Sequence, residues 1–173
     1  MKYLKTFFAV LGVISAGLVC VLLVFFLYAH FFRAGTHHDT ATADDVRFVF
    51  NWAQLGEENI KNVAHSYESA RSMTGDHTDA YAIQAKAVPA AVLHDTRLWT
   101  RGDNLSETEK KGVAFVTLFT RQFPWFLDKQ ELMSGNIYVY CWSLVFHGKE
   151  AAAAKIIFAR PSTNTIFYAS VKT

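Results

Sequence analysis

The longest feature of the hydrophobic pattern is an uncharged apolar run near the N-terminus. Residues 6–32 contain no Asp, Glu, Lys or Arg, and they lie between Lys5 and Arg33. As a helix rising 1.5 Å per residue, the run spans about 40 Å, more than the ~30 Å hydrocarbon core of a bilayer. A backbone at that depth must satisfy its own hydrogen bonds, which one isolated segment does only as a helix. The run therefore predicts an uncleaved transmembrane anchor.

Three other interpretations of this run fit less well. A signal peptide has an apolar region of only about 7–15 residues and a small-residue cleavage site, which the aromatic end of the run lacks. A lipoprotein signal needs small residues before its cysteine, whereas Leu18 and Val19 precede Cys20. A buried core helix of this length, apolar all round, is too long for a chain of 173 residues.

The charges beside the run predict its orientation. Lys2 and Lys5 precede it, and little positive excess follows Arg33. Because lysine and arginine favour the cytoplasmic side, we expect residues 1–5 in the cytoplasm and a single transmembrane helix over 6–32. A juxtamembrane linker over 33–41 and an exported domain over 42–173 follow. A bacterial inner-membrane protein with a periplasmic domain has this arrangement.

The first half of the exported domain gives mixed signals. Thr42 followed by Asp44 and Asp45 resembles a helix start, with Thr42 as N-cap. Apolar residues then recur near helical spacing as far as Ala70, with a break at Gly56. Residues 46–52 also alternate, so a strand there remains open. Residues 77–103 predict one or two short strands, or a strand and an extended loop.

The second half is clearer. Ser106 and Glu109 have the spacing of a capping box, and the helix that they begin runs to about Arg121 before Pro124 stops the pattern. Strands are predicted over 136–147, 151–160 and 165–172, joined by short turns. Such connections make a three-stranded antiparallel meander that needs a covering helix layer. The fold class is therefore α+β, with one or two helices packed on a curved antiparallel sheet.

Charge and cysteine content narrow the function classes. Residues 34–173 carry 14 Lys and Arg against 15 Asp and Glu, so the net charge of +2 comes from the flanks of the anchor. The basic residues are scattered among acids in the sequence, so no nucleic-acid partner is expected. Cys141 is the only cysteine after the anchor, which excludes a disulfide within the domain, and its position in a strand is typical of a buried, inert thiol.

No catalytic or cofactor motif stands out. The sequence lacks nucleophile-elbow, zinc-protease, P-loop and dinucleotide fingerprints. His37 and His38 beside Asp39 lack the further ligands that a zinc site needs, so solvated histidines are expected there. His77 and His94 each neighbour an aspartate, but adjacent side chains point in different directions. We therefore expect no enzyme, no metal and no cofactor; a hydrolase with a hidden His–Asp pair is the weakest alternative.

Aromatic residues supply the candidate binding site. Alternation places Tyr138, Tyr140 and Trp142 on one face of their strand, together with Leu144 and Phe146. This face either packs under the helices or stays open for a ligand or protein. The predicted binding residues are Trp125, Phe126, Tyr138, Tyr140 and Trp142.

The function that these features favour is non-enzymatic. We expect a membrane-anchored protein-interaction module, or an accessory subunit of an envelope membrane complex. The lipid bilayer is its first partner, through residues 6–32, and a protein in the membrane or envelope is its second. The alternative is a tethered small-molecule or lipid-binding domain, with a pocket on the curved sheet lined by Trp99, Trp125 and Trp142.

Overall fold

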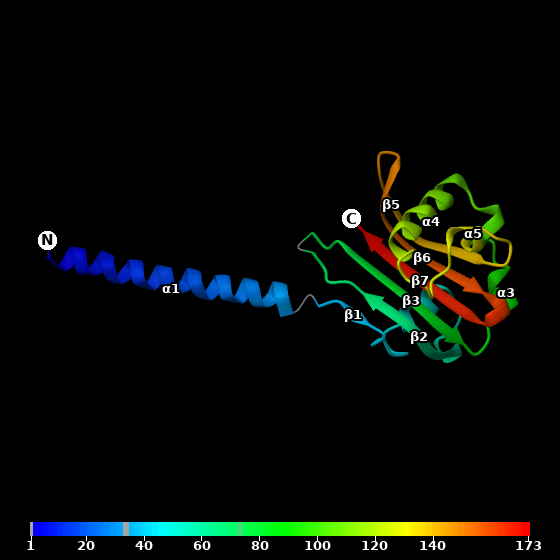
Figure 1. The fold of residues 1–173 in the computed structure, drawn as a ribbon, viewed down its shortest axis with the longest axis horizontal. Coiled ribbons are helices and arrows are strands. Elements are labelled where there is room, and N and C mark those ends of the chain that lie inside the picture. Colours follow the sequence, from blue (N-terminus) through cyan, green and yellow to red (C-terminus); the bar gives the residue numbers. More distant parts are fainter. Residues whose placement is uncertain (1, 33–34, 73) are drawn as a thin grey trace. The chain divides into compact units, whose positions relative to one another are not determined.

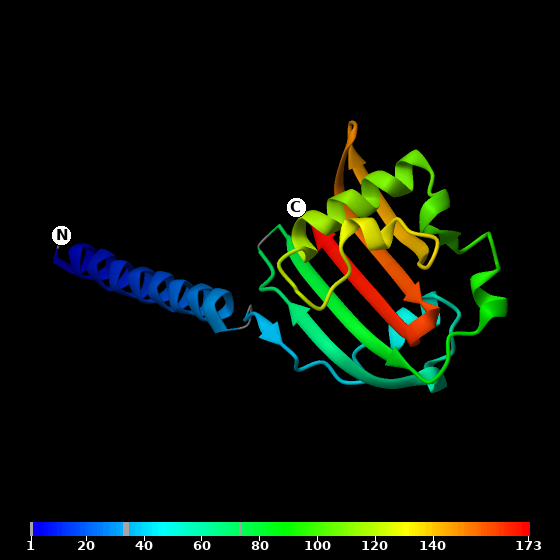
Figure 2. The same ribbon diagram turned by 45° about the vertical axis from the view of Figure 1, so that its right-hand side comes forward.

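The computed structural model describes residues 2–32, 35–72 and 74–173 in two compact units, Met1–Gly35 and Thr36–Thr173 (Figures 1 and 2). Met1, Arg33 and Ala34, which belong to the predicted flanks of the anchor, lie outside the described residues. The first unit is the helix α1 (Lys2–Phe32). Its segment Leu11–Tyr28 has a mean hydropathy of 2.6 and no buried residue, so α1 is a candidate membrane span.

A seven-stranded antiparallel sheet forms the frame of the second unit. Its strands lie in the order β1-β2-β3-β7-β6-β5-β4. Strand β3 pairs with β7 along its length and so joins the N-terminal strands to the C-terminal meander β5-β6-β7 that the sequence predicts. The strand bounds are β1 His37–His38, β2 Ile60–Glu68, β3 His77–Ala85, β4 Thr100–Arg101, β5 Tyr138–His147, β6 Glu150–Arg160 and β7 Thr165–Lys172.

Helices cover both faces of this sheet. The 14-residue helix α4 crosses one face over the C-terminal strands (Figure 2). Short helices cover part of the other face. The remaining helical bounds are α2 Arg47–Trp52, α3 Ala90–Leu93, α4 Glu107–Thr120, α5 Lys129–Leu132, and the 3₁₀ turns η1 Glu57–Asn59, η2 Gly102–Asn104 and η3 Pro161–Thr163.

The predicted capping box at the start of α4 is confirmed. The Ser106 hydroxyl accepts a hydrogen bond from the Glu109 amide at 3.3 Å, and the Glu109 carboxylate accepts one from the Ser106 amide at 2.8 Å. These bonds satisfy two amides that a helix N-terminus otherwise leaves unpaired. The helix starts where the sequence requires and ends at Thr120, one residue before the predicted end.

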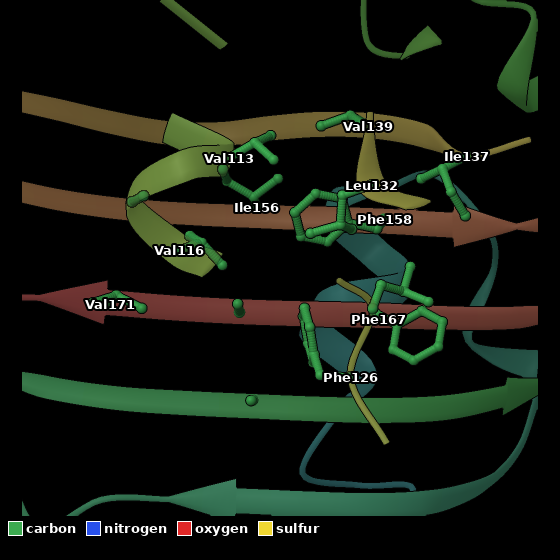
Figure 3. Packing of buried hydrophobic residues seen from close by; sticks show 14 of the residues in the cluster. Val113, Val116, Phe126, Leu132, Ile137, Val139, Ile156, Phe158, Phe167 and Val171 are labelled. Atoms are coloured by element: carbon green, nitrogen blue, oxygen red, sulfur yellow. The ribbon is translucent and has the colours of Figure 1, made fainter. Parts of the chain in front are cut away.

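A large hydrophobic cluster lies between α4 and the sheet, and we call this side the α4 face. Figure 3 shows Val113 of α4 beside Ile156 of β6, with Val116 towards β7 and Phe158 farther along β6. The chain after α4 adds Phe126 and Leu132, and all of these residues except Phe126 are fully buried. Because aliphatic and aromatic side chains fill the whole space, the hydrophobic effect holds α4 on the strands.

A second cluster lies on the opposite side, which we call the α2 face. Val49 and Phe50 of α2 are fully buried with Ile157, Ile166 and the 2% exposed Trp99. Both clusters are formed by residues of Thr36–Thr173 alone. The second unit therefore contains a complete core of its own.

The helix predicted from Thr42 towards Ala70 is wrong for most of its length. Only α2 is helical; Thr42 donates to the Asp45 carboxylate in a turn, and the N-cap of α2 is Val46, without a side-chain cap. Residues 60–68 form β2, whose pairing with β3 has two register shifts. Each bulge adds a residue to the strand, which stretches the apolar spacing from two residues towards the three or four of a helix.

The predicted alternation of β5 is wrong at Leu144, and two register shifts interrupt it, between Cys141 and Ser143 and between Val145 and Phe146. A register shift between Cys141 and Ser143 carries Leu144 to the α4 face, although the alternation placed it with Trp142. There Leu144 lies so close to α4 that a Cβ on Gly112 would be 2.5 Å from its Cδ2 atom. A bulge reverses the side chains that follow it as far as the next shift, and the alternation of β5 did not reveal this change.

Candidate functional site

The five predicted binding residues do not share one surface. Trp125 and Phe126 pack on the α4 face, whereas Tyr138 and Tyr140 pack on the α2 face. Phe126 is only 8% exposed and makes edge-to-face contacts with core rings. Trp142 alone is strongly exposed, at 44%. The structure therefore separates the predicted site into buried Phe126, three half-buried rings on opposite faces and one exposed tryptophan.

Trp142 is held by a partner that the sequence prediction missed. Its ring stacks on Trp52 of α2 with 4.6 Å between centroids and 3° between planes. Tyr140 meets the edge of Trp142 at 6.1 Å, and Lys155 of β6 places its ammonium 5.6 Å from the centre of the Trp52 ring. Offset ring stacking and a cation over a ring are both favourable, so the pair is fixed in place. We call Trp52 and Trp142 the tryptophan pair.

The i, i+4 spacing of Phe48 and Trp52 is a local signal that would have placed Trp52 in an aromatic cluster, although it does not reveal the contact with Trp142. On a helix these two rings lie side by side, and in α2 their centroids are 4.8 Å apart. Phe48 also meets Tyr168 of β7 at 5.3 Å. Alternation in residues 46–52 left a strand open. A strand would also place both rings on one side, but about 13 Å apart, so only the helix brings them into contact.

A polar hollow of about 390 Å³ lies beside the tryptophan pair. It is bordered by Phe48 and Trp52 of α2 and by residues of β3, β6 and β7. The floor carries a carboxylate, a guanidinium, an imidazole and hydroxyl groups. Its lining residues are Phe48, Trp52, Arg71, His77, Asp79, Tyr81, Lys155, Tyr168 and Ser170.

Asp79 is the most constrained charge in this hollow. It is 6% exposed, and its Oδ2 atom accepts a hydrogen bond from Arg71 at 2.7 Å. Its buried Oδ1 atom has no hydrogen-bond partner. Burial raises the pKa of Asp79, although the Arg71 hydrogen bond and charge oppose that shift. A buried acceptor without a donor is costly, so a ligand N–H or O–H group would be stabilised here.

His77 is held by hydrogen bonds at both ring nitrogens. Its Nδ1 atom lies 2.8 Å from the Gly75 carbonyl oxygen, so Nδ1 carries the proton, and its Nε2 atom accepts from the Ser170 hydroxyl at 2.9 Å. Asp79 is 3.9 Å away, beyond hydrogen-bond distance. Ser170 is 2% exposed. The His77–Ser170 hydrogen bond ties β3 to β7.

Two tyrosines in the floor are also held protonated. Tyr81 donates to Glu68 at 2.7 Å, and burial together with this carboxylate raises the pKa of Tyr81. Burial raises the pKa of Tyr168 to about 12. Both hydroxyls therefore remain neutral hydrogen-bonding groups at physiological pH.

The remaining candidates lie away from the hollow. His37 and His38 are exposed and form β1, which pairs with the end of β2, so the predicted linker contributes a short strand. Within the described ranges, no group of three His, Cys, Asp or Glu residues is arranged to hold a metal ion. Burial is the main cause that raises the pKa of the Cys141 thiol to about 12, so the thiolate nucleophile is scarce at neutral pH.

Comparison with models of protein families, with curated proteins and with solved structures finds no significant match to this chain.

Proposed function

We propose that this protein is a membrane-anchored, non-enzymatic interaction module, an accessory subunit that binds another protein of an envelope membrane complex. The tryptophan pair carries the proposal. Tryptophan is enriched among the residues that dominate binding energy, and a rigid, half-exposed ring loses little conformational entropy on binding. Trp142 is 44% exposed, yet its stacking on Trp52 holds it in one orientation.

The anchor supports the same function. A partner in the same membrane meets the module at a raised effective concentration, so a contact of modest area is sufficient. By the positive-inside rule, Lys2 and Lys5 favour a cytoplasmic N-terminus and a C-terminal unit outside the cytoplasm. A reporter that is active only outside the cytoplasm, fused after Thr173, should be active. Activity of a cytoplasm-only reporter would contradict this topology.

Partner capture tests the contact surface. Trp142→Ser should reduce co-purification of crosslinked partners from native membranes by about tenfold or more, as for an interfacial tryptophan. Val145→Ser is the matched control, because Val145 lies on the same strand and is 47% exposed. Equal capture by the two variants would show that the tryptophan pair is not part of the contact surface.

The polar hollow favours a second candidate function, the binding of a small molecule on the curved sheet. The unpartnered Oδ1 atom of Asp79 is the observation in its favour, because it lies in a residue that lines the hollow. Asp79→Asn preserves the shape but changes the acceptor set. If this variant loses a bound small molecule while Trp142→Ser retains it, the second function replaces the first.

A further inference from the structure

The outer side of α4 carries a second, chemically different surface. A hollow of about 370 Å³ lies between α4, the start of α5 and the β5–β6 hairpin, which stand side by side in Figures 1 and 2. Phe115 and Leu118 supply apolar lining, and Leu118 is 59% exposed. Four cations line the same hollow. We call the set Lys111, Phe115, Leu118, Arg121, Lys129 and Lys149 the basic cup.

The cations of the basic cup are only weakly balanced by acids: the charge of Lys111 acts on Glu107, whose ion-pair partner is Lys110. Within the described residues, none of them lies in ion-pair contact with a carboxylate, and Glu150 is the only acid that lines the hollow. Residues 34–173 as a whole carry one more acid than base. The fold therefore brings four basic residues that are far apart in the sequence to one place on the surface.

We propose that the basic cup binds the anionic headgroups of a phospholipid bilayer. Lys and Arg beside an exposed apolar residue are typical of surfaces that settle at the boundary between headgroups and acyl chains. In this arrangement the cations meet lipid phosphates, and Leu118 enters the apolar boundary. The proposal rests on α1 spanning a bilayer and does not depend on the tryptophan pair.

Two observations favour lipid over an acidic protein. Three of the four cations are lysines, and lysine is depleted at protein interfaces. Phe32 and Thr36 are four residues apart, so extended chain between them spans only about 14 Å. A bilayer that holds α1 is therefore always within reach of the second unit, at a high effective concentration.

Lysine acetylation of the full chain in nanodiscs tests this proposal. Labelling of Lys111, Lys129 and Lys149 should fall about threefold or more in phosphatidylglycerol discs relative to phosphatidylcholine discs, and 0.5 M salt should abolish the difference by screening. Lys61 and Lys86 are exposed internal controls on other parts of the sheet and should label equally in both discs. Equal labelling of the cup lysines would overturn the proposal. Whether the full chain incorporates into the discs is a separate test of α1 as a membrane anchor.

Matched variants exclude an indirect effect. In Lys111→Ala/Lys149→Ala, the protection of Lys129 by phosphatidylglycerol should be lost, whereas Lys61→Ala/Lys86→Ala should retain it. Equal melting temperatures establish that both variants fold. A further outcome would overturn the lipid assignment. In it, free glycerol phosphate or an acidic peptide such as polyglutamate protects the cup lysines from acetylation in phosphatidylcholine discs, but phosphatidylglycerol discs do not protect them.

Discussion

The two faces of the sheet are closed to different extents. The α4 face lies under a 14-residue helix with a capping box and under the chain that follows it. The α2 face lies under helices of six and four residues, neither of which has a side-chain cap. A short helix covers fewer strand positions, so one end of the α2 face remains open as the polar hollow. The difference indicates that the α4 face contributes most of the packing energy, whereas the α2 face exposes the polar groups that a ligand or partner could contact.

Strand β7 displays this difference within one element. On the α4 face, Phe167 and Val171 are both buried in the hydrophobic cluster. On the α2 face the same strand proceeds from Ile166 through Ser170 to Lys172, from apolar to charged. Only the α2 face of β7 changes from apolar to charged residues. The polar residues of β7 therefore lie where the short helices do not cover the strand.

The largest expected effect comes from truncating a ring on each face. Phe158→Ala should cost about 4 kcal/mol, because it leaves a cavity at a fully buried position under α4. Trp52→Ala should cost only about half of that, because Trp52 is half-buried at the open end. Denaturant unfolding of residues 36–173 measures both. Equal losses would mean that the two faces are equally closed.

The next effect concerns how the helices begin. Ser106→Ala removes the α4 capping box and should lower the free energy of unfolding by about 1 kcal/mol. Thr42→Ala removes only an exposed turn contact to Asp45 and should cost a few tenths of that amount. A larger loss from Thr42→Ala would show that the turn before α2 organises its face.

A smaller, pH-dependent effect should mark the open end. The raised pKa of Asp79 means that the folded protein holds this proton more tightly than the unfolded chain. Its contribution is favourable below the ordinary value of 3.8 and is lost as pH rises through the folded pKa. The melting temperature of the wild type relative to Asp79→Asn should therefore fall between pH 4 and pH 7. A rising difference would mean that the Arg71 ion pair outweighs burial.

The smallest effect is expected at Cys141. The thiol is the only cysteine of the second unit and has a pKa of about 12. Melting of residues 36–173 should therefore be unchanged by a thiol reductant, and a thiol reagent at pH 8 should react only on unfolding. Fast labelling of the folded protein would show that the β5 bulge opens the α4 face.

Local signals in the sequence predicted part of this fold. The Ser106–Glu109 capping box and the short turns between the last three strands are local, so they appear as patterns of neighbouring residues. β2 was missed because its bulges stretch the apolar spacing towards that of a helix. The switch of Leu144 was missed because the residues of β5 still alternate in the sequence across its first bulge.

The candidate site was less predictable than the fold. Trp142 was identified from strand alternation, but its partner Trp52 lies 90 residues away and meets it only when α2 packs on the sheet. The hollow likewise depends on Asp79 and Ser170 meeting across the β3–β7 pairing. Long-range pairing of this kind has no counterpart in the spacing of one segment.

Site-specific photocrosslinking tests the central claim most directly, namely that the open end of the α2 face is the contact surface. A photoreactive phenylalanine analogue at position 142 should give a discrete crosslinked protein in native membranes. The same analogue at position 125, a half-buried tryptophan on the α4 face, should give little. A discrete product from position 125 and none from position 142 would contradict the claim.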